Sequence, residues 1–204
     1  MKKKELEMLL QKVPIYEYPN PFIEQYITPA HIASDIIFTA FGFGDIKDKK
    51  VIDLGCGTGI FSFGAKITNA KEVIGIDIDE KVIEIAKDFA KKNNVEIQYF
   101  VKNVKDFENE CDTVLMNPPF GAQKSNRRAD RGFIEKAFEI SKVIYSLHLS
   151  KTIEFIEKMV AALEGEISFS KNYIFPIKHT YFFHKKKSVD CNVTLLRILT
   201  RKNE

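Results

Sequence analysis

The feature that most constrains the fold of this 204-residue chain is a regular alternation of short apolar segments with amphipathic ones. Four apolar segments, at 49–54, 72–77, 96–101 and 112–116, are separated by stretches such as 79–94, in which apolar residues recur with the spacing of a helix. Apolar runs without polar alternation are typical of strands that are covered on both faces. The pattern therefore predicts an α/β fold with a mostly parallel, doubly wound sheet.

The segments outside this central region extend the same plan. We expect a short opening helix, and then a helix with Thr28 as its cap and Pro29 in its first position. Asp79 is the predicted cap of the helix that follows it. The later pattern predicts helices over about 132–146 and 151–162 and final strands over 165–175 and 188–199.

Length and composition indicate one well-filled domain over residues 1–204. Hydrophobic residues make up 45% of the chain, and no repeat, low-complexity tract or long linker divides it. No apolar run approaches the roughly 18 residues of a membrane span, so we expect no membrane-spanning segment and no membrane partner. Cys56, Cys111 and Cys191 are widely spaced and form no CxxC pair, which favours a reducing cytoplasm over a disulfide framework or a zinc site.

A glycine-rich turn follows the first apolar segment, in "VIDLGCGTGIFS". Gly55, Gly57 and Gly59 have the spacing GxGxG, whereas dinucleotide enzymes use GxGxxG to bind a pyrophosphate at a helix N-terminus. Asp53, just before the turn, would repel an anion and attract an ammonium group. Asp77 lies 22 positions after Gly55, near the roughly 20 expected of a carboxylate that accepts ribose hydroxyls.

These two signals together predict an adenosine that carries a cationic amino-acid tail and no phosphate, which describes S-adenosylmethionine. The alternative is a tight turn with no ligand, in which Asp77 only caps the next helix.

The stretch "LMNPPFG" ends the fourth apolar segment. Pro118 and Pro119 donate no backbone hydrogen bond and stiffen the strand exit. The Asn117 side-chain oxygen and the Pro118 carbonyl are predicted to accept both N–H bonds of a planar amino group and to aim its lone pair, while Phe120 stacks on the group. The alternative is a stiff strand exit with Phe120 in the core.

With these motifs, the sequence resembles the seven-strand, Rossmann-like S-adenosylmethionine-dependent methyltransferases that carry an (Asn/Asp)-Pro-Pro-(Phe/Tyr) motif. More closely, it resembles the archaeal and eukaryotic family that makes N6-methyladenosine in small-subunit ribosomal RNA. The likeness covers about residues 20–199. It rests on "EQYITPAHIA", "VIDLGCGTGIFSFGA", "IGIDID", "DTVLMNPPFGAQ", "VIYSLH" and "FHKKKSVD".

The resemblance implies a single seven-strand sheet with an antiparallel C-terminal edge, and an N-terminal extension, 1–27, that contributes to the cofactor site. The cofactor contacts that it also implies are Gln25, Thr28, Gly55, Thr58, Ile60, Asp77, Asn103 and Val104. To these we add Asp53, Gly57 and Gly59 of the glycine turn as candidate cofactor residues. Asn103 stands where the family usually has an acid, and its amide oxygen could still accept the cofactor's amino hydrogens.

Two basic clusters are candidates for RNA binding, although the net charge is only +3. The first follows the Asn-Pro-Pro-Phe motif and could close over an extruded nucleotide. The second interleaves cations with Tyr181, Phe182 and Phe183, as suits single-stranded RNA. The first could instead be an ordinary solvated loop, whereas one of the adjacent Phe182 and Phe183 in the second is expected to point into the core. The members of the two clusters are Lys124, Arg127, Arg128 and Arg131, and His184, Lys185, Lys186 and Lys187.

The third apolar segment is expected at an edge of the sheet, with Ile97, Tyr99 and Val101 on one face. An uncovered edge invites another strand. The family resemblance implies a small zinc-binding activator protein that adds a strand at 96–101. Within this chain the histidines and cysteines have no ligand spacing, so no metal is predicted, and His148 is interpreted as structural.

The leading prediction is therefore an adenine-N6 methyltransferase of small-subunit ribosomal RNA. Three alternatives stay open, one of which is DNA as the substrate, although we identify no separate target-recognition domain that would read a DNA sequence. Glutamine presents a similar planar amide nitrogen, so the chain could be a protein N5-glutamine methyltransferase. It could also bind cofactor and RNA without catalysis, as a ribosome assembly factor.

Overall fold

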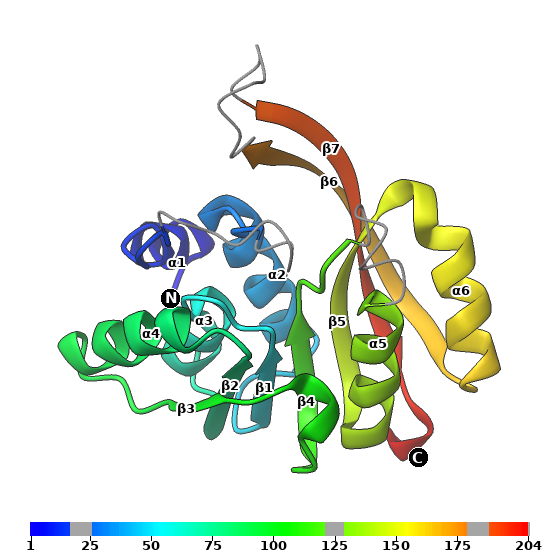
Figure 1. Ribbon diagram of the computed structural model, residues 1–204, viewed down its shortest axis with the longest axis horizontal. Coiled ribbons are helices and arrows are strands. Elements are labelled where there is room, and N and C mark those ends of the chain that lie inside the picture. The colour runs from blue at the N-terminus through cyan, green and yellow to red at the C-terminus, as the bar shows by residue number, and fades with distance from the viewer. Residues whose placement is uncertain (17–25, 121–128, 179–187, 204) are drawn as a thin grey trace.

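A computed structural model of the chain describes residues 1–16, 26–120, 129–178 and 188–203. In this part, seven strands form one sheet in the order β3-β2-β1-β4-β5-β7-β6 (Figure 1). Strands β1 to β5 pair in parallel, and β7 runs antiparallel to both of its neighbours. The strands are β1 Lys50–Leu54, β2 Glu72–Asp77, β3 Gln98–Val101, β4 Cys111–Met116, β5 Ser141–Leu149, β6 Glu166–Lys178 and β7 Ser188–Leu199. The predicted mostly parallel sheet with an antiparallel C-terminal edge is confirmed.

Helices cover both faces of this sheet (Figure 1). One face carries α1 to α4, and the other carries α5 and α6. The α-helices are α1 Lys3–Leu10, α2 Ala30–Gly42, α3 Ile60–Ile67, α4 Glu80–Lys92, α5 Ala129–Ile140 and α6 Ile153–Ala162. The short 3-10 helices are η2 Val104–Asp106, η4 Ser150–Thr152 and η5 Arg201–Asn203.

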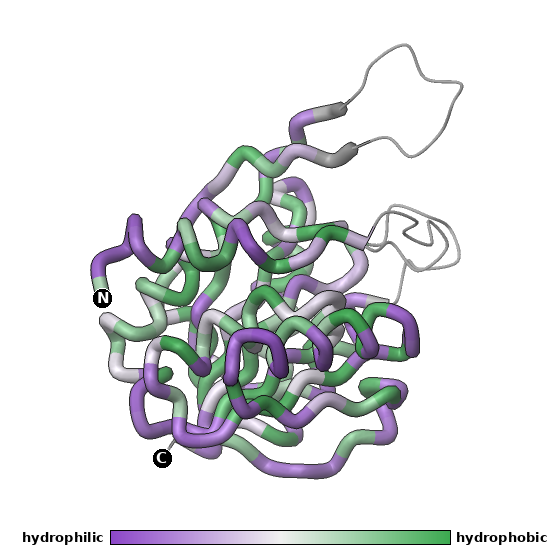
Figure 2. The backbone as a smooth tube through the Cα atoms, turned by 90° about the vertical axis from the view of Figure 1, so that its left-hand side faces the viewer, coloured by the Kyte–Doolittle hydropathy of each residue, from purple (hydrophilic) through white to green (hydrophobic). Residues whose placement is uncertain are grey.

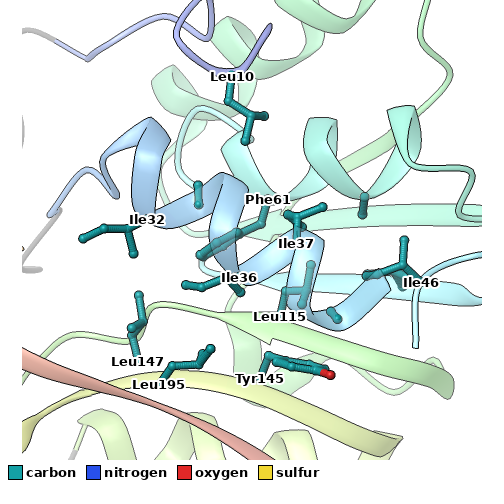
Figure 3. Packing of buried hydrophobic residues seen from close by; sticks show 14 of the residues in the cluster. Leu10, Ile32, Ile36, Ile37, Ile46, Phe61, Leu115, Tyr145, Leu147 and Leu195 are labelled. Atoms are coloured by element: carbon teal, nitrogen blue, oxygen red, sulfur yellow. The ribbon is translucent and has the colours of Figure 1, made fainter. Parts of the chain in front are cut away.

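Neighbouring residues of the central strands divide between two cores, because successive side chains in a strand point to opposite faces. Val51 joins the core under α1, α2 and α3, whereas Ile52 joins the core under α5 and α6. Figure 3 shows α2 side chains between Leu10 of α1 and the sheet residues Leu115, Tyr145, Leu147 and Leu195. Each fully buried Ile or Leu stabilises the fold by about 1.5–3 kcal/mol.

The chain order creates a switch point beside β1. From β1 the chain proceeds to β2 and β3 on one side, and then crosses to β4 on the other. In doubly wound sheets, ligands bind outside the carboxyl ends of the strands at such a point. The glycine turn follows β1 and the Asn-Pro-Pro-Phe motif follows β4, so the two motifs leave the sheet at the same edge.

The β6–β7 hairpin reaches beyond that edge. Leu149, the last residue of β5, pairs with Val193, so residues 188–192 of β7 continue past the end of β5. Strand β6 accompanies them as far as Lys178. Figure 2 shows the hairpin projecting at the top of the molecule, opposite a lower edge of mostly hydrophilic loops.

The N-terminal helices are joined to this hairpin through Asp35 of α2. Its carboxylate accepts hydrogen bonds from Lys3 of α1 at 2.5 Å, and from Lys171 and Tyr173 of β6 at 2.6 and 2.7 Å. Burial alone would raise the pKa of Asp35, but the Lys171, Lys3 and Tyr173 side chains outweigh it and lower the pKa to about 2. The cluster therefore holds α1, α2 and β6 together at pH values above about 2, where Asp35 is ionised.

One predicted element is wrong. The expected helix over about 132–146 is the end of α5 followed by strand β5 at 141–149. Eight of the nine β5 residues are buried, because helices cover both faces. Such a run has no period-2 signal that would separate it from a buried helix, and only its β-branched and aromatic content favoured a strand.

Other boundaries shift by a few residues. Pro29, and not Thr28, occupies the cap position of α2, and no side chain of the described residues caps that end. Strand β3 begins at Gln98 and not at 96, and β6 continues to Lys178. Asp79 does cap α4, since its side chain accepts a hydrogen bond from the Lys81 N–H at 3.0 Å. Among the described residues, every helix is too short or too polar to cross a membrane.

Candidate active site

The glycine turn wraps around the carboxyl end of β2. The N–H groups of Gly55 and Cys56 both donate to the Ile76 carbonyl, at 2.8 and 2.9 Å. The Gly57 N–H donates to Asp77 Oδ2 at 2.9 Å, and the Asp79 N–H donates to Asp77 Oδ1 at 3.0 Å. Burial raises the pKa of Asp77, while these N–H groups lower it. A carboxylate has about four acceptor positions, so Asp77 can still accept a hydrogen bond from a ribose hydroxyl beside these N–H groups.

Asp53 is buried near the end of β1, beneath the glycine turn, and does not lie at the surface of the turn. It is 1% exposed, and its Oδ2 accepts hydrogen bonds from the Ser62 N–H at 2.8 Å and the Ser62 hydroxyl at 2.6 Å. Its Oδ1 is buried with no hydrogen-bond partner among the described residues. Burial raises the pKa of Asp53 to about 7, against the two Ser62 hydrogen bonds that lower it. The carboxyl group is therefore poised between its neutral and ionised forms near neutral pH.

Tyr99 of the edge strand β3 packs against the turn from below. A Cβ atom at Gly59 would overlap the Tyr99 hydroxyl, and one at Gly75 would lie 2.6 Å from the Tyr99 ring. Gly59 also has φ +88°, a backbone conformation that only glycine adopts without strain. The turn therefore needs glycine at 59 both for its backbone and for its contact with Tyr99.

Asn117 directly follows β4 and is held by the N-terminal segment. Its Nδ2 donates to the Tyr26 carbonyl at 3.2 Å and to the Thr28 hydroxyl oxygen at 3.1 Å. Its Oδ1 is buried and has no hydrogen-bond partner among the described residues. Both N–H bonds of the amide are thus used, while its oxygen remains an acceptor.

Phe120 lies between two other aromatic rings. The Tyr26 ring stacks on it, with centroids 5.4 Å apart and planes 19° apart, and Phe175 of β6 meets it edge-on at 5.8 Å. Only 6% of Phe120 is exposed. Tyr26 thus covers one face of the Phe120 ring. Stacking of Phe120 on a target base therefore stays a prediction.

The remaining predicted cofactor residues occupy varied settings. Thr58 and Val104 are buried, and Ile60 is the first residue of α3. Asn103 is exposed, and its Oδ1 accepts a hydrogen bond from the Lys105 N–H at 3.0 Å, which caps η2. Gln25 lies outside the described residues.

Most of the predicted RNA-binding residues fall outside the described part of the chain. This holds for Lys124, Arg127 and Arg128, and for the cluster at 184–187. Arg131 is described: it lies on α5, where its Nε donates to Glu135 Oε1 at 2.8 Å. Its charge is therefore partly neutralised on its own helix.

The β3 edge is only partly as predicted. Ile97 and Tyr99 pack inward, but Val101 is 47% exposed, together with Phe100 on the opposite face at 43%. Between residues 26 and 203, as far as they are described, β3 has β2 as its single partner strand. The edge thus presents apolar side chains and unpaired backbone groups to solvent.

His148 is structural, as interpreted from the sequence. It is 2% exposed and shares a 2.7 Å hydrogen bond with the Ser146 hydroxyl through Nε2. Burial lowers its pKa to about 3, which keeps the ring neutral. Within the described ranges, no group of three or more His, Cys, Asp or Glu side chains is arranged to hold a metal ion.

Sequence reasoning missed three residues of this site: Tyr26, Ser62 and Tyr99. Ser62 could have been found, because it follows Asp53 by nine positions on the helix that the turn begins. The contact of Tyr26 with Asn117 spans 91 positions, and no local pattern marks it.

The chain is similar to known methyltransferases. The model of the methyltransferase small domain family matches residues 30–142. The rRNA N(6)-adenosine-methyltransferase METTL5 of Danio rerio is 37% identical to it, over 97% of this chain and 98% of that one. A crystal structure from Pyrococcus horikoshii, of a protein provisionally described as an RNA methyltransferase, has a TM-score of 0.91 and 36% identity over 98% of each chain.

A shorter likeness points to another substrate class. A protein of Methanocaldococcus jannaschii, provisionally described as a protein N5-glutamine methyltransferase, is 34% identical over 54% of this chain and 56% of its own length. The likenesses to the two RNA methyltransferases therefore run the length of the chain, whereas this one spans about half.

Proposed function

The chain belongs to the methyltransferase small domain family and, within it, to the family of the METTL5 ribosomal RNA adenine-N6 methyltransferases, and we propose that it makes N6-methyladenosine in small-subunit ribosomal RNA. It is thus an S-adenosylmethionine-dependent enzyme. We propose that residues 1–204 act as one domain, and the three unpaired cysteines fit a reducing, cytoplasmic location.

One observation carries the assignment of the target: the Asn117 amide has a buried oxygen with no hydrogen-bond partner in the part of the chain that the structure describes, and Pro118 follows it at the end of β4. An exocyclic amino group has its lone pair delocalised into the ring and is a poor nucleophile. Two acceptors in the plane of that group, Asn117 Oδ1 and the Pro118 carbonyl, would hold its hydrogens and direct the lone pair at the methyl carbon. The carbonyl of Pro118 is fixed in direction by the two stiff proline residues.

The cofactor fits the residues on the other side of the switch point. Asp77 retains lone pairs for ribose hydroxyls, and the open space beside Gly57 lets a ligand approach the backbone. When bound, S-adenosylmethionine supplies a methyl carbon on a positive sulfur, which leaves with the electrons of the carbon–sulfur bond. The target nitrogen forms the new bond and then releases one proton, so the chain's own task is orientation and exclusion of water.

RNA rather than protein as substrate is supported by the hairpin. Strands β6 and β7 continue beyond the edge where the site lies, and the segment between them contains the basic and aromatic cluster. Cations for phosphate and rings for stacking suit an RNA strand. The small-subunit target follows the family resemblance.

We also propose that a small zinc-binding activator protein pairs with the β3 edge. Strand addition there is supported by the exposed Phe100 and Val101 and by the outer edge of β3, which has β2 as its single partner strand among the described residues. Replacing both residues with lysine should abolish co-purification with the activator, because charges discourage edge pairing. A double variant that still co-purifies would move the activator to another surface.

The direct test supplies labelled S-adenosylmethionine and unmodified small-subunit ribosomal RNA to the pure protein, with and without the activator, and identifies the labelled nucleoside by mass spectrometry. We expect N6-methyladenosine, and its loss in Asn117→Ala with RNA binding unchanged. Equal methylation by Asn117→Ala would remove Asn117 from the mechanism. A protein that binds RNA and labels nothing would be an assembly factor.

Protein N5-glutamine methylation is the second candidate, because a glutamine amide presents the same planar nitrogen and the shorter likeness supports it. A cell-extract protein in the same reaction separates the two. Label on glutamine and none on RNA would retain the motif's role and replace the substrate.

A further inference from the structure

The orientation of the Asn117 amide is fixed by a group that cannot donate. A main-chain carbonyl only accepts hydrogen bonds, and the Tyr26 carbonyl lies 3.2 Å from one polar atom of the Asn117 amide. If that atom were the amide oxygen, two acceptors would face each other in a buried place. The nitrogen therefore has to face Tyr26, and the oxygen has to face the opposite way, where it has no partner in the described part of the chain.

The Thr28 hydroxyl supplies the second anchor. It lies 3.1 Å from the same nitrogen, so the two N–H bonds are held by two acceptors from one short segment. Thr28 is 4% exposed. A hydrogen bond in such a buried place is little weakened by competing water.

The segment that carries these acceptors is itself held in place. Pro29 has φ −60° and is the cap residue before α2, whose inner face lies in the core. The Tyr26 ring stacks on Phe120. The segment therefore touches both ends of the Asn-Pro-Pro-Phe motif.

We propose that Tyr26 and Thr28 are positioning residues that turn the Asn117 amide oxygen toward the target nitrogen, and that they make this site require asparagine rather than aspartate at 117. The proposal deepens the proposed function and rests on it. An aspartate would place a second acceptor against the Tyr26 carbonyl, so its carboxylate would turn away or lose its anchors. Thr28 could still donate its hydroxyl proton to a carboxylate, but Tyr26 could not.

Family resemblance gives Thr28 a different role, as a cofactor contact. The two roles differ in what they predict. A cofactor contact changes the affinity for S-adenosylmethionine and its product, whereas a positioning residue changes turnover at saturating cofactor. Measuring cofactor affinity and turnover separately therefore decides between the two roles of Thr28.

The test compares Thr28→Val, Thr28→Ser and Asn117→Asp with the unchanged protein. The Kd for S-adenosylhomocysteine is measured by calorimetry, and kcat at saturating cofactor on ribosomal RNA. Thr200→Val is the matched control, because Thr200 is equally buried, at 5%, and donates to the Ser141 carbonyl at the far end of the sheet. Thr200→Val loses a buried hydrogen bond that has no role in the site, so the kcat of this variant should be unchanged.

We expect Thr28→Val to lower kcat about 10-fold with Kd nearly unchanged, and Thr28→Ser to restore most of the turnover, because it returns the acceptor. Asn117→Asp should lower kcat about 100-fold, close to Asn117→Ala. The proposal is overturned if Thr28→Val affects kcat no more than Thr200→Val, if it raises only Kd, or if Asn117→Asp keeps most activity.

Failure of this inference differs from failure of the proposed function. If the unchanged protein labels no RNA, the proposed function falls and the inference falls with it, whereas RNA methylation by Asn117→Ala would remove Asn117 from the mechanism and overturn the inference alone. If Asn117→Ala is inactive while Asn117→Asp and Thr28→Val remain active, only the inference falls. Should Thr28→Val not fold, Asn117→Asp still decides the outcome, because Thr28→Ser retains the acceptor.

Discussion

The cofactor side and the target side of the site are built in different ways. On the cofactor side, Asp53 is bonded to Ser62 nine positions away, and Asp77 to Gly57 twenty positions away. On the target side, Asn117 is bonded to Tyr26 across 91 positions. One side is encoded by a contiguous strand-turn-helix-strand segment, and the other exists only once the chain has folded.

This difference predicts that the two sides can be damaged separately. Changes in the glycine turn should weaken cofactor binding, whereas changes in the segment around Tyr26 should slow turnover while cofactor still binds. A variant of one side that produces the defect of the other would show that the two sides of the site are not independent.

The largest effect is expected on the cofactor side, from Gly59→Ala. The new methyl group meets the Tyr99 hydroxyl, and the backbone at φ +88° becomes strained. Strain and overpacking together cost about 2–5 kcal/mol. Urea denaturation should show this loss of stability, and calorimetry should show that S-adenosylhomocysteine binds at least about 10-fold more weakly.

Gly42→Ala is the control for that substitution. Gly42 is the last residue of α2, and a Cβ atom there would meet nothing within 4 Å. Alanine in a helix should leave stability equal or higher by up to about 1 kcal/mol. Normal cofactor affinity in Gly59→Ala would contradict the contact between Tyr99 and the turn.

A second effect on the cofactor side is a dependence of stability on pH. The pKa of Asp53 is about 7 in the folded protein, above its ordinary 3.8, so its stabilising contribution is complete below pH 3.8 and is lost as the pH rises toward 7. The pKa of His148 is about 3, below its ordinary 6.5, so its contribution is complete above pH 6.5 and is lost as the pH falls. The two oppose each other between about pH 4 and 6.5.

Asp53→Asn should therefore reveal the contribution of His148 to the pH dependence of stability. Urea unfolding of this variant should show the free energy of unfolding rising with pH over that window more steeply than in the unchanged protein, by up to about 1.4 kcal/mol per pH unit. Equal slopes in the two proteins would mean that Asp53 ionises normally in the folded state.

On the target side, Tyr26→Ala should lower kcat about 10-fold, because Phe120 loses its stacked neighbour and the segment that holds Asn117 loosens. The affinity for S-adenosylhomocysteine should stay the same. Phe38→Ala serves as the control, since Phe38 is an exposed aromatic residue of α2, at 40%. An unchanged kcat in Tyr26→Ala would show that the Tyr26 side chain has no role in turnover.

The smallest effect is expected from Arg131→Ala. Its guanidinium is already paired with Glu135, and it lies on an exposed helix. RNA affinity, measured by filter binding at fixed salt, should fall by no more than about 3-fold. A much larger loss would make Arg131 a direct phosphate contact.

The sequence was sufficient to predict the alternation of strands and helices, the antiparallel edge and the cap at Asp79, since each depends on local pattern or on a family-wide motif. It was not sufficient for β5, whose burial on both faces removes the periodic signal. The anchoring of Asn117 was hidden for another reason. Main-chain carbonyls carry no residue identity, so no sequence pattern announces that Tyr26 accepts a hydrogen bond.

We propose that Asn117 receives the target amino group with its oxygen while Tyr26 and Thr28 hold its nitrogen. A crystal structure with a bisubstrate analogue, in which the N6 of an adenosine is tethered to an S-adenosyl group, tests this most directly. We predict N6 within about 2.7–3.2 Å of Asn117 Oδ1 and of the Pro118 carbonyl, with the Asn117 amide nitrogen still on Tyr26 and Thr28. An analogue whose N6 lies away from Asn117, or an amide turned with its nitrogen toward the base, would contradict the account.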